Sequence, residues 1–145
     1  MGGGLLVAFE WKDRYSLNIG EIDKQHKRLF EIGARVYDLA VLSDSYDHYD
    51  EILEMLNELL EYTEYHFRYE ENIMKIHKYA GYNQQLREHE FYVNKIKSIS
   101  TRDIDEDQHQ AIIDIVDFLS EWIGSHILLE DRKYAAYFQE NGIVI

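Results

Sequence analysis

No proline occurs anywhere in the 145 residues of this chain. Proline is the commonest breaker of α-helices, because it lacks a backbone N–H donor and its ring clashes with the preceding turn. Hydrophobic residues make up 46% of the chain and charged residues 30%, a composition typical of globular proteins. The length is that of one ordinary domain. We therefore expect residues 1–145 to form a single all-α domain.

Four stretches carry apolar residues at three- and four-residue spacing, the period at which side chains share one face of a helix. They span about residues 22–42, 49–77, 84–99 and 108–129. Short connections between such helices favour antiparallel neighbours, so the pattern predicts an up-down-up-down four-helix bundle. Residues 1–20 include Trp11 and Tyr15 and are too apolar for a free tail. We expect them to form an extended arm over one end of the bundle.

The chain is strongly acidic, with 28 acidic and 15 basic side chains and a formal net charge of −13. A nucleic-acid backbone or an anionic membrane surface would repel such a protein, so neither is expected as a partner. No apolar run approaches the roughly 20 residues that a membrane span needs, and the first residues lack the pattern of a secretory signal. A cytoplasmic location is the resulting expectation.

Four histidines fall on the apolar faces of the four predicted helices, one on each: His26, His66, His89 and His126. A polar side chain on an inward stripe needs a partner. A single histidine of this kind is more often a hydrogen-bonded core residue, but one on every helix is better explained by a shared metal site. The chain has no cysteine, which excludes thiolate zinc sites and iron–sulfur clusters. Nitrogen and oxygen atoms must then hold the metal.

Two carboxylates accompany these histidines. Glu70 follows His66 by four residues, so both side chains lie on one helix face. Asp131 follows His126 by five residues and lies beyond the predicted helix end, so it reaches the site only if that end unwinds or bends. Four imidazoles and two carboxylates are too many for one tetrahedral zinc ion and suit two ions bridged by carboxylates. Iron is the first choice for this ligand set, and manganese is the alternative.

The segments that carry these residues resemble the hemerythrin family, specifically the single-domain bacterial hemerythrins, over Trp11 to about Phe138. The resemblance rests on Ile22-Asp23-Lys24-Gln25-His26, on His66-Phe67-Arg68-Tyr69-Glu70-Glu71, on His89, on Trp122-Ile123-Gly124-Ser125-His126 and on Asp131-Arg132-Lys133-Tyr134. It implies a non-haem di-iron centre that binds dioxygen reversibly.

The resemblance also implies a role for each matching residue. His26 and His66 are similar to the ligands of the iron with an open coordination position, and His89 and His126 to ligands of the other iron. Glu70 and Asp131, with an oxo or hydroxo group, would bridge the two.

Five apolar residues next to the ligands are candidates for the wall of a dry ligand pocket: Leu29, Phe67, Trp122, Ile123 and Ile127. All of them except Ile127 are similar to residues that line the oxygen pocket in the family.

One ligand departs from the family pattern. The family has a His-x-x-x-His pair on the third helix, whereas this chain has Gln85 four residues before His89. A glutamine amide oxygen is a weaker ligand than imidazole and leaves the charge of the site unchanged. We therefore expect water or an exogenous ligand to complete the shell of the metal beside Gln85. The remaining histidines, His48, His77 and His109, fall in or beside polar connections and are interpreted as surface residues.

The leading hypothesis is a binding protein that carries, stores or supplies dioxygen, accepts small anionic ligands and has a reductase as a candidate partner. The alternative is an enzyme, since loss of one imidazole would open a second coordination position and favour peroxidase or oxidase turnover. A third hypothesis, an oxygen or iron sensor, would need a signalling domain or partner in addition. The pattern carries no indication of oligomeric state.

Overall fold

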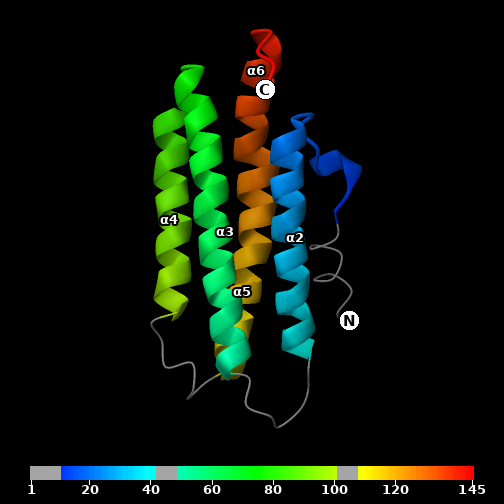
Figure 1. Ribbon diagram of the computed structural model, residues 1–145, viewed down its shortest axis with the longest axis vertical. Coiled ribbons are helices and arrows are strands. Elements are labelled where there is room, and N and C mark those ends of the chain that lie inside the picture. The colour runs from blue at the N-terminus through cyan, green and yellow to red at the C-terminus, as the bar shows by residue number, and fades with distance from the viewer. Residues whose placement is uncertain (1–10, 42–48, 101–107) are drawn as a thin grey trace.

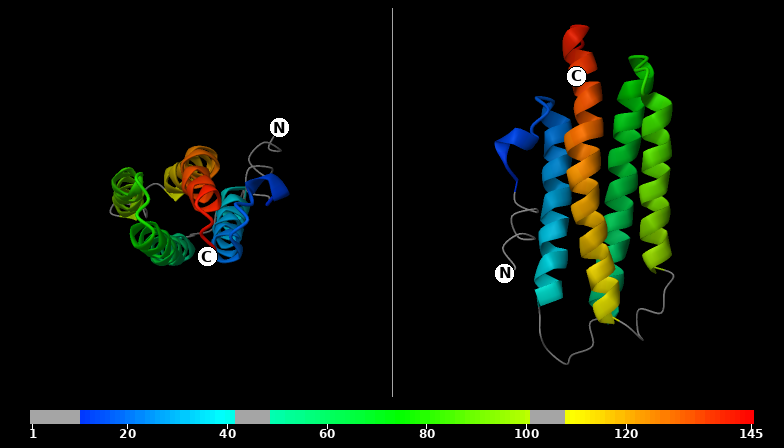
Figure 2. Two further views of the ribbon diagram at one scale, coloured as in Figure 1. Left: turned by 90° about the horizontal axis from the view of Figure 1, so that it is seen from above. Right: turned by 180° about the vertical axis from the view of Figure 1, so that it is seen from behind.

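The computed structural model of the protein describes residues 11–41, 49–100 and 108–145. Its long helices are α2 (Gly20–Val41), α3 (Tyr49–Ile76), α4 (Tyr82–Ser100) and α5 (Gln108–Trp122). They lie side by side, and successive helices run in opposite directions (Figure 1). Seen along their axes, they surround a common interior (Figure 2). The described part of the chain contains no β-strand. The predicted all-α, up-down-up-down four-helix bundle is confirmed.

The fourth rod of the bundle is longer than the sequence pattern indicated. The prediction that this helix ends near residue 129 was wrong, because the helical backbone continues after α5 through η2 (Ile123–Asp131) and α6 (Arg132–Glu140). The charged run at 130–133 suggested a helix end, but Arg132 and Lys133 are simply the exposed face of α6. Its inward face carries Tyr134 and Phe138, four residues apart and both buried. α6 projects beyond the other helices (Figure 1).

The η2 segment has π-helical geometry. In a π-helix the backbone hydrogen bond joins residue i to residue i+5, so each turn is wider than an α-helical turn. Such turns are rare and occur mostly inside α-helices at functional sites. In this chain the π segment joins α5 to α6 without interrupting the rod.

The other three helices begin and end within two residues of the ranges expected for them. The connections between the helices lie largely at 42–48 and 101–107, outside the described residues. No helix in the described ranges is both long enough and apolar enough to cross a membrane.

The described part of the N-terminal arm, residues 11–19, lies beside α2 (Figure 2). It contains one short 3-10 turn, η1 (Asp13–Tyr15), whose Tyr15 is buried. The carboxylate of Asp23 accepts hydrogen bonds from the backbone N–H of Leu17, at 2.8 Å, and from the hydroxyl of Ser16. Arg132 of α6 donates to the backbone carbonyl of Arg14 at 2.7 Å. These contacts attach the expected arm to the α6 end of the bundle.

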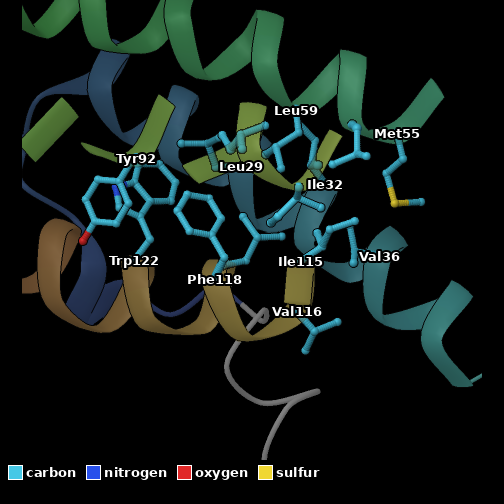
Figure 3. Packing of buried hydrophobic residues seen from close by; sticks show 14 of the residues in the cluster. Leu29, Ile32, Val36, Met55, Leu59, Tyr92, Ile115, Val116, Phe118 and Trp122 are labelled. Atoms are coloured by element: carbon cyan, nitrogen blue, oxygen red, sulfur yellow. The ribbon is translucent and has the colours of Figure 1, made fainter. Parts of the chain in front are cut away.

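Buried apolar side chains form two clusters at different heights along the bundle. The first cluster fills the half nearer the connections and includes Leu29, Ile32, Val36, Met55, Leu59, Ile115 and Phe118 (Figure 3). The second cluster lies at the α6 end and consists of Leu17, Ile19, Ile22, Ile73, Met74, Tyr134 and Phe138.

Polar residues separate the two clusters along each helix. On α2, His26 lies between Ile22 of the second cluster and Leu29 of the first. On α3, Glu70 lies between Phe67 and Ile73 in the same way. A buried polar layer therefore crosses the bundle between two apolar layers.

Candidate metal centre

The buried polar layer contains every side chain that the sequence suggested as a metal ligand. His26 comes from α2, His66 and Glu70 from α3, His89 from α4, and His126 and Asp131 from η2. None of these six side chains is more than 2% exposed. The amphipathic period of each helix turns its ligands inward, and the antiparallel arrangement brings them to one height.

The six side chains form two overlapping groups of candidate ligands. One group contains His26 and His66, and the other contains His89 and His126, while both include Glu70 and Asp131. Within each group the ligand atoms lie within 4.8 Å of one another. Two groups that share both carboxylates outline two adjacent metal positions with the carboxylates between them.

Asp131 divides its two oxygens between the two groups. Its Oδ2 lies 3.1 Å from Nε2 of His26, and its Oδ1 lies 3.1 Å from Nε2 of His126. In a regular α-helix, residues five apart point about 140° away from each other around the axis. The wider π-helical turn of η2 lets Asp131 and His126 face the same centre. The expectation of irregular geometry here was right in kind, but the helix widens instead of ending.

Glu70 contacts both groups through its carboxylate. Its Oε1 lies 2.9 Å from Nε2 of His66 and 3.7 Å from Nε2 of His89. Its Oε2 lies 4.0 Å from Nε2 of His26 and accepts a hydrogen bond from the hydroxyl of Tyr134. Tyr134 therefore holds the orientation of a carboxylate that faces three histidines.

The centre contains buried polar atoms that have no hydrogen-bond partner: Nε2 of His26, Nε2 of His66, Oε1 of Glu70, Oε1 of Gln85 and Oδ2 of Asp131. Each such atom costs about 1–3 kcal/mol when left unpaired. The spacings of roughly 3 Å between neighbouring ligand atoms are those expected of ligands that share one ion at about 2 Å. A pair of cations would satisfy these atoms, so the residues present fit a two-metal centre.

Gln85 is buried beside the centre, with 2% of its surface exposed. Its amide nitrogen donates to Oδ1 of Asp131 at 3.3 Å, and its amide oxygen has no partner. The structure thus brings Gln85 together with the six candidate ligands. His77, by contrast, lies just after α3 and packs edge-on against Phe138, so it does not replace the missing imidazole. His48 and the side chain of His109 lie outside the described residues.

Outer hydrogen bonds orient three of the imidazoles. Nδ1 of His66 donates to Oε1 of Gln25 at 2.7 Å. Nδ1 of His89 donates to Glu71 at 2.7 Å, and Nδ1 of His126 to Glu88 at 3.4 Å. An outward Nδ1–H leaves the Nε2 lone pair free for a metal, and such partners tune metal affinity. His26 differs, because its Nδ1 has no partner.

The hydrogen-bond partners of the imidazoles were not predicted from the sequence. Gln25 and Glu88 each precede a histidine ligand, and Glu71 follows Glu70. Adjacency to a ligand was the available signal, but the pairing runs between different helices. Only the tertiary packing defines which carboxylate meets which imidazole.

Burial and neighbouring charges shift the pKa values of several groups in the centre. Burial disfavours the charged form of His126, but Asp131, Glu88 and Glu70 outweigh it and raise the pKa of His126 to about 10. Burial also opposes ionisation of Asp131, yet His126 and His26 hold its pKa well below the usual value. Burial lowers the pKa of His66 despite the opposing effect of Glu70. A metal ion that binds to His126 would therefore displace a proton from it.

Four of the five predicted pocket residues, Leu29, Phe67, Trp122 and Ile127, are buried in the first cluster. The ring of Phe67 stacks on His89 with centroids 3.8 Å apart, and Trp122 lies nearly parallel to His126 at 6.0 Å. These rings cover one side of the centre with apolar surface. The side chain of Ile123 lies outside the described residues.

A groove of about 470 Å³ runs along the surface between α3 and α4. The residues that line it include Phe67, Glu71 and His89, together with the basic residues Arg68 and Lys97. It approaches the half of the centre that contains His89.

Comparison with known proteins gives the same picture. A family model described as the hemerythrin HHE cation binding domain matches residues 17–138. The bacteriohemerythrin of Clostridium acetobutylicum is 38% identical over 87% of this chain and 98% of its own length. That of Stenotrophomonas maltophilia is 30% identical over 90% of this chain and 81% of its own. The myohemerythrin of Sipunculus nudus is 27% identical over 92% of this chain and 97% of its own. The chain belongs to the hemerythrin family.

Proposed function

We propose that this protein is a non-haem di-iron protein that binds dioxygen reversibly. The observation that carries the proposal is the pair of four-residue ligand groups that share Glu70 and Asp131. His26 and His66 would hold one iron, His89 and His126 the other, and the two carboxylates would bridge them. The similarity to bacteriohemerythrins and to a myohemerythrin supports iron as the metal. A bound iron pair would supply the electrons with which dioxygen is held.

The residues around the centre have three tasks in this function. The outer acceptors Gln25, Glu71 and Glu88 hold the imidazoles with Nε2 inward. Tyr134 keeps Glu70 oriented between the two positions. The apolar wall keeps the ligand position dry, which matters because water and protons promote irreversible oxidation of the centre.

Gln85 gives the position beside His89 and His126 one imidazole fewer than the family pattern. Its buried amide oxygen, free of hydrogen bonds, is available as a weak ligand. Water or a small anion such as azide would complete the shell of an iron bound at this position. The same observation favours a second candidate function, turnover of peroxide or dioxygen, because an exchangeable coordination position would lie close to the groove at His89.

One set of measurements tests both functions. Iron content and the optical spectrum of the oxidised protein should show two irons per chain with oxo-bridge charge-transfer bands. His66→Ala should lower the iron content, while His77→Ala, which changes a histidine outside the centre, should leave it unchanged. Repeated cycles of oxygenation and deoxygenation would support carriage, and sustained peroxide consumption with a reductant would support turnover. Iron content well below one per chain in the unaltered protein would contradict both.

A further inference from the structure

Tyr134 is the one tyrosine among the described residues whose hydroxyl donates directly to a candidate metal ligand. It is completely buried, and its hydroxyl hydrogen-bonds to Oε2 of Glu70. A tyrosine at this position has a redox-active ring next to the centre and a proton acceptor already in place. Dioxygen binding and metal binding do not require the side chain that donates to Glu70 to be redox-active.

Tyr134 is also the first ring of a series that reaches the surface. Its ring lies 6.4 Å from that of Tyr79, edge to face, and Tyr79 lies 5.3 Å from Tyr137. Tyr79 and Tyr137 are both partly exposed at the α6 end of the bundle. The hydroxyl of Tyr137 donates to the backbone carbonyl of His77 at 2.8 Å, which holds the last ring in place. Rings at these separations are in edge or offset contact.

Gly81 leaves room for the ring of Tyr79, the middle ring of the series. A Cβ atom at this residue would lie 2.6 Å from Cε2 of Tyr79 and 2.8 Å from its hydroxyl oxygen, too close for any real contact. The glycine therefore lets the Tyr79 ring lie against the backbone where α4 begins. Because the blocked atoms belong to the end of a side chain, an alanine here would displace the ring without disrupting the backbone.

We propose that Tyr134, Tyr79 and Tyr137 form a relay that carries oxidising equivalents from the metal centre to the protein surface when the centre reacts with hydrogen peroxide. The proposal rests on the di-iron function and adds a protective redox role to it. Its effect is to move damage away from the histidine ligands and toward rings that external reductants can reach.

Each step of the relay moves one electron and one proton. Tyr134 would give one electron to the oxidised centre, and its phenolic proton would shift within the existing hydrogen bond toward Oε2 of Glu70 without detaching that carboxylate from the metal pair, so that a neutral phenoxyl radical forms. Tyr79 then returns an electron to Tyr134, whose oxygen takes the shared proton back, while the proton of Tyr79 is released to water. Tyr137 reduces Tyr79 in the same way. Two passages, with two electrons from a donor such as ascorbate and two protons, reduce one hydrogen peroxide to two water molecules.

Tyr92 offers a competing route and therefore a matched control. It is nearly as buried as Tyr134 and its ring lies 5.5 Å from His126. Its hydroxyl pairs with Ser125 instead of a metal ligand. Removing this hydroxyl should leave the relay intact, because the hydroxyl pairs with Ser125 and not with a candidate ligand.

The test uses the iron-loaded full chain, mixed with hydrogen peroxide and frozen within milliseconds for electron paramagnetic resonance. The unaltered protein should show a tyrosyl radical. Tyr134→Phe should remove most of it, Tyr79→Phe should confine it to Tyr134, and Gly81→Ala should reduce its transfer outward without removing any tyrosine. Tyr92→Phe should match the unaltered protein. Mass spectrometry should find oxidised ligand histidines several-fold more often in Tyr134→Phe and Tyr79→Phe.

The outcomes separate this inference from the proposed function. A chain that fails to take up iron contradicts the di-iron function itself. Full iron loading with no tyrosyl radical, or with a radical that only Tyr92→Phe removes, overturns the relay alone. Tyr79→Phe changes no residue that contacts a candidate ligand other than through Tyr134, so it keeps the test valid if Tyr134→Phe loads iron poorly. Gly81→Ala retains the backbone carbonyl that accepts from the N–H of Gln85 at 3.0 Å, and iron content is measured in this variant as well.

Discussion

The two halves of the metal centre differ in both their ligands and their surroundings. On one side, His66 is backed by the neutral amide of Gln25, and Nδ1 of His26 has no partner. On the other side, carboxylates back both imidazoles, Glu71 behind His89 and Glu88 behind His126. This second side is also the one where glutamine stands in place of a third imidazole.

The difference indicates how the chain tolerates a weak ligand. A carboxylate that accepts the Nδ1–H of an imidazole raises the basicity of that ligand. The half with Gln85 therefore has one imidazole fewer than the family pattern, but each of its two imidazoles is made more electron-rich by its outer partner. The half with His26 and His66 has no such support and depends more on the shared carboxylates. Substitutions in the shared carboxylates and on either side of the centre would test this contrast.

Asp131→Ala should prevent iron binding in both halves of the centre, so the difference between them would disappear. Asp131 is the residue whose two oxygens face different histidines, at 3.1 Å each. Without it, each position loses a ligand, and His26 and His126 lose their nearest negative charge. Iron content should fall to near zero by elemental analysis. If one iron per chain were retained at full occupancy, the bridging assignment would be wrong.

Metal uptake should strengthen with pH. The metal-free protein holds a proton on His126, whose pKa is raised to about 10, and a metal ion must displace it. Between pH 6.5 and 10, apparent affinity should therefore rise by about tenfold per pH unit. The stability of the metal-free fold should change in the opposite direction: the gain from protonated His126 is fully present below pH 6.5 and is lost as the pH rises through about 10.

Competition with a chelator, using zinc as a redox-inert probe at pH 7, 8 and 9, would measure this dependence. Thermal unfolding of the metal-free protein over the same range gives the opposing trend. A flat affinity profile would mean that His126 is not charged before the metal binds.

Glu71→Ala should weaken the half that contains His89 and spare the other. Its carboxylate accepts from Nδ1 of His89 at 2.7 Å, the shortest outer contact to that half. Loss of such a partner typically costs about 10- to 100-fold in metal affinity. The matched variant Gln25→Ala, behind His66, should weaken the opposite half. Stepwise titration with metal would show which position binds metal more weakly in each variant. Identical titration profiles for the two variants would contradict the contrast between the halves.

Gln85→His should have the smallest effect on metal content and the clearest effect on ligand exchange. It supplies the third imidazole that the family pattern has and occupies an already buried position. In this variant, azide should no longer bind to the oxidised protein at the half of the centre that contains His89. Spectroscopic titrations with azide before and after the change would test this, and identical azide stoichiometry would show that Gln85 leaves no exchangeable position.

The sequence allowed prediction of the bundle and of the ligand cluster because both depend on helical periodicity. One inward histidine per helix, with Glu70 one turn after His66, needs only the 3.6-residue repeat and short connections. The continuation of the last helix to Glu140 was missed, since the charged surface of α6 resembled a helix end. The roles of Gln25, Glu71 and Glu88 were missed because they depend on how one helix is rotated against its neighbour.

The π-helical segment η2 has a consequence beyond the position of Asp131. A single residue inserted into or removed from a regular helix shifts everything after it by about 100° around the axis. Converting η2 to ordinary α-helical winding would thus rotate the whole of α6 relative to α5, turning Tyr134 and Phe138 away from the second cluster. The widened turns that bring Asp131 to the centre therefore also set the rotation of α6 about its axis. That rotation determines whether its apolar face covers the end of the bundle.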